Sequence, residues 1–239
     1  MKIGRLLVLN VSFLLCAASV YGQGLIVIHD PVADMNESPK VELSATERNV
    51  MNRVALPKVR KRLAGEEFCK EEFDPSAVLH GSFSRTGSKQ TVIFYQFCQT
   101  GNGLGQVGLV LIEGAKMLAS YLADVGWTVG GRAVPDLNRN GLDEIALYYS
   151  GGIHQGNGGV GVDLMEFNPA GLKGIGWFQA DNFTDDGDDY SYKVWARPGT
   201  RPIFYHQKFV SDNSGKFRRV STQTAFRLSP AVGKFAPVR

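Results

Sequence analysis

The pattern of apolar and polar residues first marks an export signal. Residues 6–20 form a mostly apolar run that three polar residues interrupt, with Lys2 and Arg5 before it and Gly22 shortly after it. A basic start, a short apolar run and small residues at its end are typical of a secretory signal peptide. The run is shorter than the roughly 20 residues that cross a bilayer. We therefore expect residues 1–22 to be removed and no membrane segment to remain.

The next part of the chain, residues 23–76, predicts a linker followed by a helix. Residues 23–43 lack a clear period, so they are either a linker or contain an edge strand. Ser44 and Glu47 then form a capping box, and apolar residues follow at helical spacing. Pro57 lacks the N–H that a helix interior needs, so we expect the helix to end or restart there.

From residue 77 onward the pattern changes to short strands separated by glycine-rich turns. Three similar stretches, around Gly87, Gly141 and Gly199, each place a turn glycine before β-branched and aromatic residues. Further matching pairs are Gly101–Gly103 with Gly156–Gly158, Leu111–Glu113 with Leu164–Glu166, and Gly126–Trp127 with Gly176–Trp177.

These matches indicate a repeated unit of about 50 residues, which is typical of propeller blades or a related β array. The prediction is a mainly β domain over residues 77–239, behind the short helical segment. Its three propeller-blade-like repeats span about residues 77–130, 131–185 and 186–236, as an open or incomplete β-propeller.

Composition and net charge limit the classes of partner that this chain is expected to bind. The 239 residues are 44% hydrophobic and 21% charged, with a formal charge of +3 that falls to about +1 without the leader. A charge this balanced argues against nucleic acid as a partner. Cys69 and Cys98 remain after export, and a disulfide between them is expected in an oxidising compartment.

The second repeat contains the motif that carries chemistry. Oxygen side chains stand at alternate positions of a loop, glycine occupies the sixth position, and a carboxylate closes the ninth. This arrangement collects the oxygen ligands that Ca²⁺ prefers. The expected ligands are the side chains of Asp136, Asn138, Asn140 and Glu144 and the carbonyl of Leu142, with Asp143 pointing outward or adding charge nearby. The alternative is a turn without metal, because Asn and Asp favour such turns.

Asp136 to Leu147 resembles the calcium loop of FG-GAP or VCBS-type repeats, the units of integrin-like β-propellers. The resemblance extends over about residues 77–225 and implies extracellular blades with Ca²⁺ held between strands. The first repeat has only uncharged oxygen at the ligand positions, and the third has no such set, so one calcium site is expected. Three blades are fewer than the usual ring, which leaves an open array, a capped array or completion by a second chain.

Other motifs point to structure more than to chemistry. The G-x-G-x-x-G stretch at residues 103–108 is interpreted as tight turns and not as a dinucleotide site, because the pattern is weak alone. Aromatic residues near an acidic loop fit either a carbohydrate platform or a core, with the core favoured; they are Trp177, Tyr190, Tyr192 and Trp195. The four histidines show no ligand spacing.

The leading hypothesis is a secreted or periplasmic, calcium-stabilised, non-enzymatic binding module. Its partner would be an extracellular protein or carbohydrate, and it could assemble as a homo-oligomer. The alternative is a secreted hydrolase of polysaccharide or peptide, with acids such as Glu113, Asp163 and Glu166 in a cleft.

Overall fold

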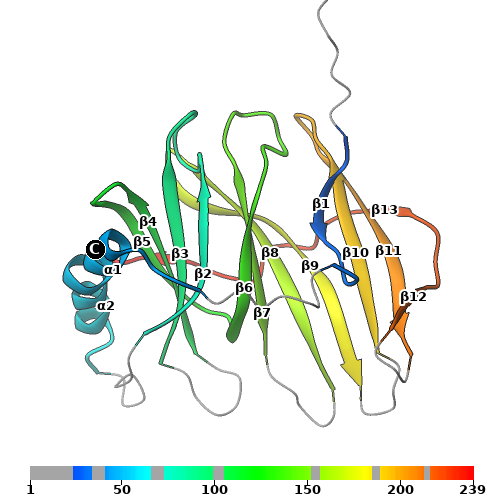
Figure 1. The fold of residues 1–239 in the computed structure, drawn as a ribbon, viewed down its shortest axis with the longest axis horizontal. Helices are drawn as coiled ribbons and strands as arrows, with labels where there is room; N and C mark the ends of the chain where they lie inside the picture. The colour runs from blue at the N-terminus through cyan, green and yellow to red at the C-terminus, as the bar shows by residue number, and fades with distance from the viewer. Residues whose placement is uncertain are drawn as a thin grey trace, which may run out of the picture.

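The protein is mainly β, with its strands side by side in a curved row and a helix at one end of the row (Figure 1). The computed structural model describes residues 24–33, 41–65, 73–98, 105–151, 157–184, 189–212 and 216–239. The predicted signal peptide and Cys69 lie outside these ranges, so both stay predictions. Within them, no helix is long and apolar enough to cross a membrane.

The strands form two antiparallel sheets. The small sheet has the order β14-β5-β4-β3-β2. Its strands are β2 (Asp74–Gly81), β3 (Gln90–Phe97), β4 (Gln106–Glu113), β5 (Lys116–Asp124) and β14 (Ala236–Pro237).

The large sheet follows the path β12-β11-β10-β9-β8-β7-β6 and curls into half a barrel, with β1 added on β10 and β13 on β11. Its strands are β1 (Ile26–His29), β6 (Trp127–Val134), β7 (Glu144–Ser150), β8 (Asn157–Asn168), β9 (Gly171–Thr184), β10 (Tyr190–Arg197), β11 (Ile203–Ser211), β12 (Phe217–Arg219) and β13 (Thr224–Phe226).

The predicted repeats correspond to successive groups of strands. β2–β5 span the first repeat and β6–β9 the second, and the third begins with β10 and β11. Each glycine stretch lies in the loop between the first two strands of its group, at residues 82–89, 135–143 and 198–202. However, β9 pairs with β10, so the second and third groups belong to one sheet. The described strands therefore form two sheets and no propeller ring.

Pro57 was expected to end or restart the N-terminal helix; the helix does not end there, and Pro57 lies in the first turn of the α-helical segment that follows a π-helical turn. The whole helix comprises α1 (Ala45–Val50), a π-helical turn η2 (Met51–Ala55) and α2 (Leu56–Arg62). The capping box is confirmed, since Ser44 Oγ accepts from Glu47 N and Glu47 Oε2 from Ser44 N. The π-turn directly precedes Pro57, where the missing N–H already interrupts the regular ladder.

The central strands β3, β4 and β7 are buried on both faces, which explains why they are apolar at nearly every position. In β3, Val92 and Phe94 face the core shared by the two sheets, whereas Ile93 and Tyr95 face the helix. A third cluster fills the inside of the curled large sheet. Alternating strand residues therefore supply two cores at once.

Gly108 departs from its predicted place in a turn, because it lies inside β4. A Cβ there would come within 1.9 Å of the Tyr95 ring, so glycine makes room for a fully buried aromatic side chain. Packing against a neighbouring strand, and not a tight turn, explains this glycine.

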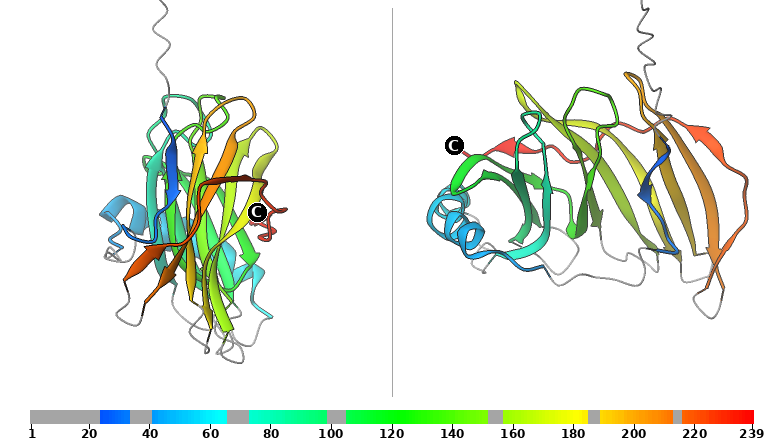
Figure 2. Two further views of the ribbon diagram at one scale, coloured as in Figure 1. Left: turned by 90° about the vertical axis from the view of Figure 1, so that its right-hand side faces the viewer. Right: turned by 45° about the horizontal axis from the view of Figure 1, so that its top comes forward.

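The C-terminal residues 227–239 form a strap that returns across the molecule. They run behind the strands from β13 to the helix at the other end (Figures 1 and 2). Trp177 and Ser229 exchange backbone hydrogen bonds of 2.7 and 2.9 Å, and Arg62 Nη1 donates to Pro237 O at 2.8 Å. The strap thus joins the large sheet, the small sheet and the helix.

Asp163 on β8 holds the middle of this strap. Its fully buried carboxylate accepts from Val232 N at 2.9 Å and from Gly233 N at 2.6 Å. Burial raises the pKa of Asp163, against the lowering effect of these two N–H donors. A carboxylate with this role is structural, which removes it from the candidate hydrolytic acids.

We predict that Asp163→Ala lowers the free energy of unfolding by about 1–3 kcal/mol, because two strap N–H groups lose their acceptor. Urea unfolding monitored by tryptophan fluorescence measures this loss. The matched control Asp124→Ala removes an exposed carboxylate from β5 and should change stability by at most about 0.5 kcal/mol. Equal effects of the two substitutions would contradict the role of Asp163.

Candidate functional site

The predicted calcium loop connects β6 to β7 and is folded around Asp136. Asp136 Oδ1 accepts from Asn140 N at 2.9 Å, and Oδ2 accepts from Gly141 N at 2.8 Å. Gly141 has a φ of +83°, and Arg139 before it has a φ of +62°. The bend predicted at the sixth loop position is therefore present, and glycine is the residue that adopts it without strain.

Glu144 closes this loop from the first position of β7. Only 1% of its surface is exposed, and Oε2 accepts from Leu137 N at 2.7 Å. The other carboxylate oxygen, Oε1, is buried without a hydrogen-bond partner among the described residues. Burial raises the pKa of Glu144 to about 7, with the negative charge of Asp136 adding to the effect and the Leu137 N–H opposing it.

Glu166 on β8 brings another carboxylate to the same place. Ile145 pairs with Met165, so Glu144 and Glu166 stand opposite each other one step further along the two strands. Like charges at opposed strand positions destabilise a sheet unless something compensates them. Lys173 Nζ lies 3.7 Å from Glu166 Oε1, but its side chain is 62% exposed and compensates little.

The loop amides also turn toward Glu166. Glu166 Oε2 accepts from Asn138 Nδ2 at 2.7 Å and from Asn140 Nδ2 at 3.3 Å. A cavity of about 150 Å³ separates the loop from the third repeat, and Asn138, Glu144, Glu166 and Pro202 are among its lining residues. The site thus combines one loop, one neighbouring strand and part of the next repeat.

All five predicted ligand residues lie in this loop or at its end, and Asn138 and Glu144 line the cavity. Their side-chain oxygens are partly engaged by the backbone. Asn140 Oδ1 accepts from Leu142 N at 2.8 Å. Among the described residues, no three His, Cys, Asp or Glu side chains are grouped so that they could hold a metal ion. A cation here would need amide or carbonyl oxygens as well, as the motif predicts. Glu166 was not predicted as a ligand: its match to Glu113 marks an equivalent position in the repeat, and only the pairing of β7 with β8 places it beside the loop.

Asp143 was expected either to point outward or to add charge near the ligands, and it points toward the loop of the first repeat. Its Oδ2 accepts from Ser82 N at 2.7 Å, and its own N–H donates to Ser82 O at 3.0 Å. Ser82 opens the equivalent loop of the first repeat. Gly199 N, in the third loop, donates to Leu137 O at 2.9 Å. The three repeat loops are therefore in contact, with the Asp136–Glu144 loop in the middle.

The first repeat has the same loop design without the charge. Gln90 occupies the position of Glu144, and its Oε1 accepts from Ser84 N at 2.9 Å. Gln90 Nε2 donates to Ser84 Oγ at 2.8 Å, and Gln90 pairs with Glu113 across the strands. A neutral amide thus closes this loop by itself. Closing the loop therefore does not require the negative charge that Glu144 carries in the second repeat.

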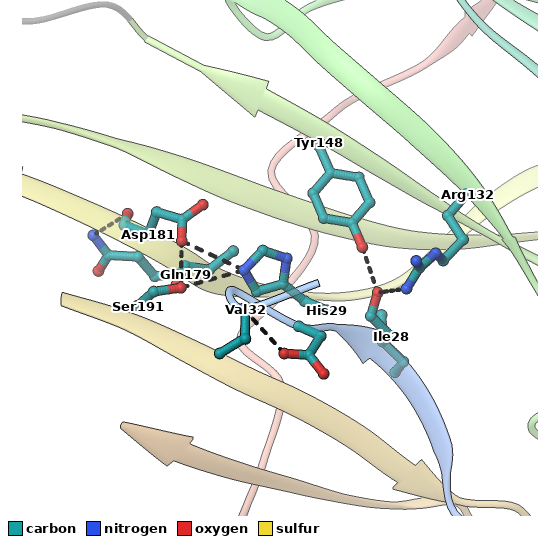
Figure 3. Close-up of polar contacts among 10 residues, drawn as sticks. Ile28, His29, Val32, Arg132, Tyr148, Gln179, Asp181 and Ser191 are labelled. Atoms are coloured by element: carbon teal, nitrogen blue, oxygen red, sulfur yellow. Dashed lines mark hydrogen bonds and ion pairs between the residues drawn. The ribbon is translucent and has the colours of Figure 1, made fainter. Parts of the chain in front are cut away.

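A second polar cluster, at β1, contains Ser, His and Asp but lacks the geometry of a catalytic triad (Figure 3). His29 Nε2 lies 3.3 Å from Ser191 Oγ and 3.4 Å from Asp181 Oδ1, and Ser191 Oγ also donates to Asp181 Oδ1. In a triad the serine and the carboxylate contact different nitrogens of the histidine. Ser191 is only 1% exposed. The cluster joins β1, β9 and β10 and is structural.

The same close-up shows how the end of β1 is held. Ile28 O accepts from Arg132 Nη1 at 3.0 Å and from the hydroxyl of Tyr148 (Figure 3). β1 thus bonds to β10 along its edge and to β6 and β7 at its end. The predicted edge strand is therefore confirmed. Buried polar groups lie against it.

The acids proposed for a hydrolase are not gathered in one cleft. Asp163 holds the strap, and Glu113 forms an ion pair with Arg85 on the small sheet. Only Glu166 lies in a cavity, where it meets Glu144. The aromatic residues also do not form one platform, the less favoured alternative: Trp195 is buried and Trp177 packs against the shared core, while Tyr192 stacks on His206 at 4.8 Å.

No family model, no curated protein and no solved structure matches the chain. The resemblance to FG-GAP or VCBS-type repeats therefore stays a prediction.

The raised pKa of Glu144 predicts a specific pH dependence of stability in the presence of a chelator. The folded state favours the protonated carboxyl of Glu144. The contribution of this group to the free energy of unfolding is therefore complete below pH 4.5 and is lost as the pH rises to about 7. The change corresponds to about 3 kcal/mol.

The side chain in Glu144→Gln can still accept a hydrogen bond from Leu137 N, as Gln90 accepts one from Ser84 N in the first repeat. Unlike the carboxyl group, its amide does not titrate. Denaturant unfolding of both proteins across this pH range should therefore give a stability difference that favours the variant increasingly as the pH rises. A difference that is independent of pH would contradict the burial of a titrating carboxyl.

Proposed function

We propose that this chain is an exported, calcium-stabilised, non-enzymatic binding module built from FG-GAP or VCBS-type repeats. The observation that carries the proposal is Glu144, whose buried carboxylate has one oxygen without a hydrogen-bond partner among the described residues. A buried charge without compensation is costly, and a bound cation compensates it.

The residues present suit Ca²⁺. Asp136, Asn138, Asn140 and Glu144 would hold it through side-chain oxygens and Leu142 through its carbonyl, with Glu166 as a further carboxylate that the structure adds. Hard oxygen donors of this kind favour Ca²⁺ over transition metals. The ion would neutralise the opposed carboxylates and fix the loop that contacts both neighbouring loops.

The size of the cavity favours a structural ion over hydrolysis. Two glutamates in a pocket, one with a pKa near 7, also fit an acid–base pair. However, about 150 Å³ is well below the roughly 300–1,000 Å³ of small-molecule sites, and Glu144 is engaged by the loop backbone. A sugar ring with its water would not fit between these side chains.

The blade-like repeats support a role in binding. Three groups of strands present equivalent loops that touch one another at one end, as neighbouring units of a β repeat array would. Loops fixed on a rigid scaffold are common recognition surfaces. We propose a secreted or periplasmic location and an extracellular protein or carbohydrate as partner, with further copies of the chain as a means of completing the array.

The proposal predicts that calcium raises the thermal stability of residues 23–239. With the dissociation constant of about 10⁻⁴–10⁻³ M that is usual for extracellular modules, 10 mM Ca²⁺ should add about 1.4–2.7 kcal/mol. For a chain of this size that corresponds to an increase in Tm of about 3–10 °C, measurable by differential scanning calorimetry in buffer at about pH 8.

Glu144→Gln should remove most of this increase, whereas the matched control Glu113→Gln, at the position equivalent to Glu166 in the first repeat, should retain it. An unchanged Tm for the wild-type protein, or the same increase in Glu144→Gln, would leave residues 136–144 as a turn without metal.

A further inference from the structure

A second and larger cavity lies between β9, the loop that precedes β11, and β13. Within the described residues, β9 pairs with β10 at Asn182–Tyr190 and Asp181–Ser191 alone, so the earlier part of β9 is not bonded to β10. The cavity has a volume of about 690 Å³, within the range of small-molecule sites. It opens between β9, β11 and β13, and we call it the β9–β11 groove.

The floor of the groove is apolar and is fixed by packing. Ile175, Phe204, Phe226 and Leu228 line it, and all four belong to or pack against the core inside the curled sheet. The Phe226 ring stands edge-on to Phe204 at 6.3 Å. Since these rings are held by their neighbours, the groove is formed before any ligand arrives.

The polar residues of the groove are cationic. Arg201 and Arg227 line it, both are exposed, and neither makes a hydrogen bond or ion pair within the described parts of the chain. No carboxylate is among its lining residues. Arginine carries a permanent charge and a planar set of donors that suits carboxylate and phosphate groups.

The groove is distinct from the candidate cation site, although the two cavities are neighbours. They share the wall formed by Ile175, Pro202 and Phe204. This wall is apolar, and it separates the acidic side, with Glu144 and Glu166, from the groove. Anionic ligands would therefore meet arginine without meeting the carboxylates directly.

We propose that the β9–β11 groove binds a single-chain amphiphile, with its apolar chain on the floor and a carboxylate or phosphate head group at Arg201 and Arg227. The inference rests on the binding role proposed above and gives it a site and a ligand class. It does not require calcium in the Asp136–Glu144 loop.

Isothermal titration with four probes of equal chain length, each below its micelle concentration, tests the proposal. The probes are dodecanoate, dodecyl phosphate, the neutral monododecyl glycerol and the cationic dodecyltrimethylammonium. We expect one site per chain and at least about tenfold tighter binding of one or both anions than of the neutral and cationic probes. Equal affinity for all four probes, or no binding of either anion, would overturn the proposal. The affinities for dodecanoate and dodecyl phosphate also show whether the site prefers a carboxylate or a phosphate head group.

Two sets of variants locate the site. Arg201→Gln with Arg227→Gln should reduce the affinity for the anions to that of the neutral probe, whereas Arg218→Gln with Arg219→Gln on β12 should leave it unchanged. Ala225→Trp places a bulky ring in the groove and should abolish binding of all probes, with thermal unfolding as the check on folding. Equal losses in the two double variants would show general charge attraction and overturn the proposal.

Glu144→Gln separates this inference from the calcium site. If that variant loses the response to calcium but still binds the anionic probes, both proposals hold. If the wild-type protein binds the probes and never responds to calcium, the groove stands and the calcium site fails.

Discussion

The buried carboxylate of Glu144 is the contact on which the arrangement of the repeats depends. It fixes the N–H of Leu137, whose carbonyl in turn accepts from the third loop, while Asp143 in the same loop bonds to the first. The three loops therefore share one scaffold. In the first repeat Gln90 closes the loop as a neutral amide, so a charged residue at this position in the second repeat requires a separate cause. The cation proposed above would provide it, because the carboxylate would then contribute attraction in place of an uncompensated burial cost.

Burial of both faces of the central strands β3, β4 and β7 sets the second constraint. Since strands cannot cover the outer faces and ends of their own sheets, other segments do so: the helix covers the small sheet, β1 lies beside β10, and the C-terminal strap joins the two sheets. Each of these contacts spans a long distance in the sequence. The protein thus depends on both ends of its chain, and the ends meet the sheets through buried polar groups such as Asp163 and His29.

Local features of the chain could be predicted from the sequence, and long-range contacts could not. The capping box at Ser44, the turn at Gly141 and the strands after each repeated glycine follow from neighbouring residues. The pairing of β9 with β10, which joins two repeats into one sheet, depends on how strands from different repeats meet. Gly108 is similar, because its role becomes clear only when the Tyr95 ring lies over it. At the site, the loop residues were predictable from their spacing, whereas Glu166 joins them through a cross-strand register that no local pattern indicates.

Equilibrium dialysis with radioactive calcium tests the central claim most directly, because it counts bound ions without relying on stability. At about pH 8, where Glu144 is deprotonated, the account predicts one ion per chain with a dissociation constant of about 10⁻⁴–10⁻³ M, and markedly weaker binding at about pH 5.5. Absence of bound calcium at 10 mM and pH 8 would contradict it, and so would binding of equal strength in Glu144→Gln.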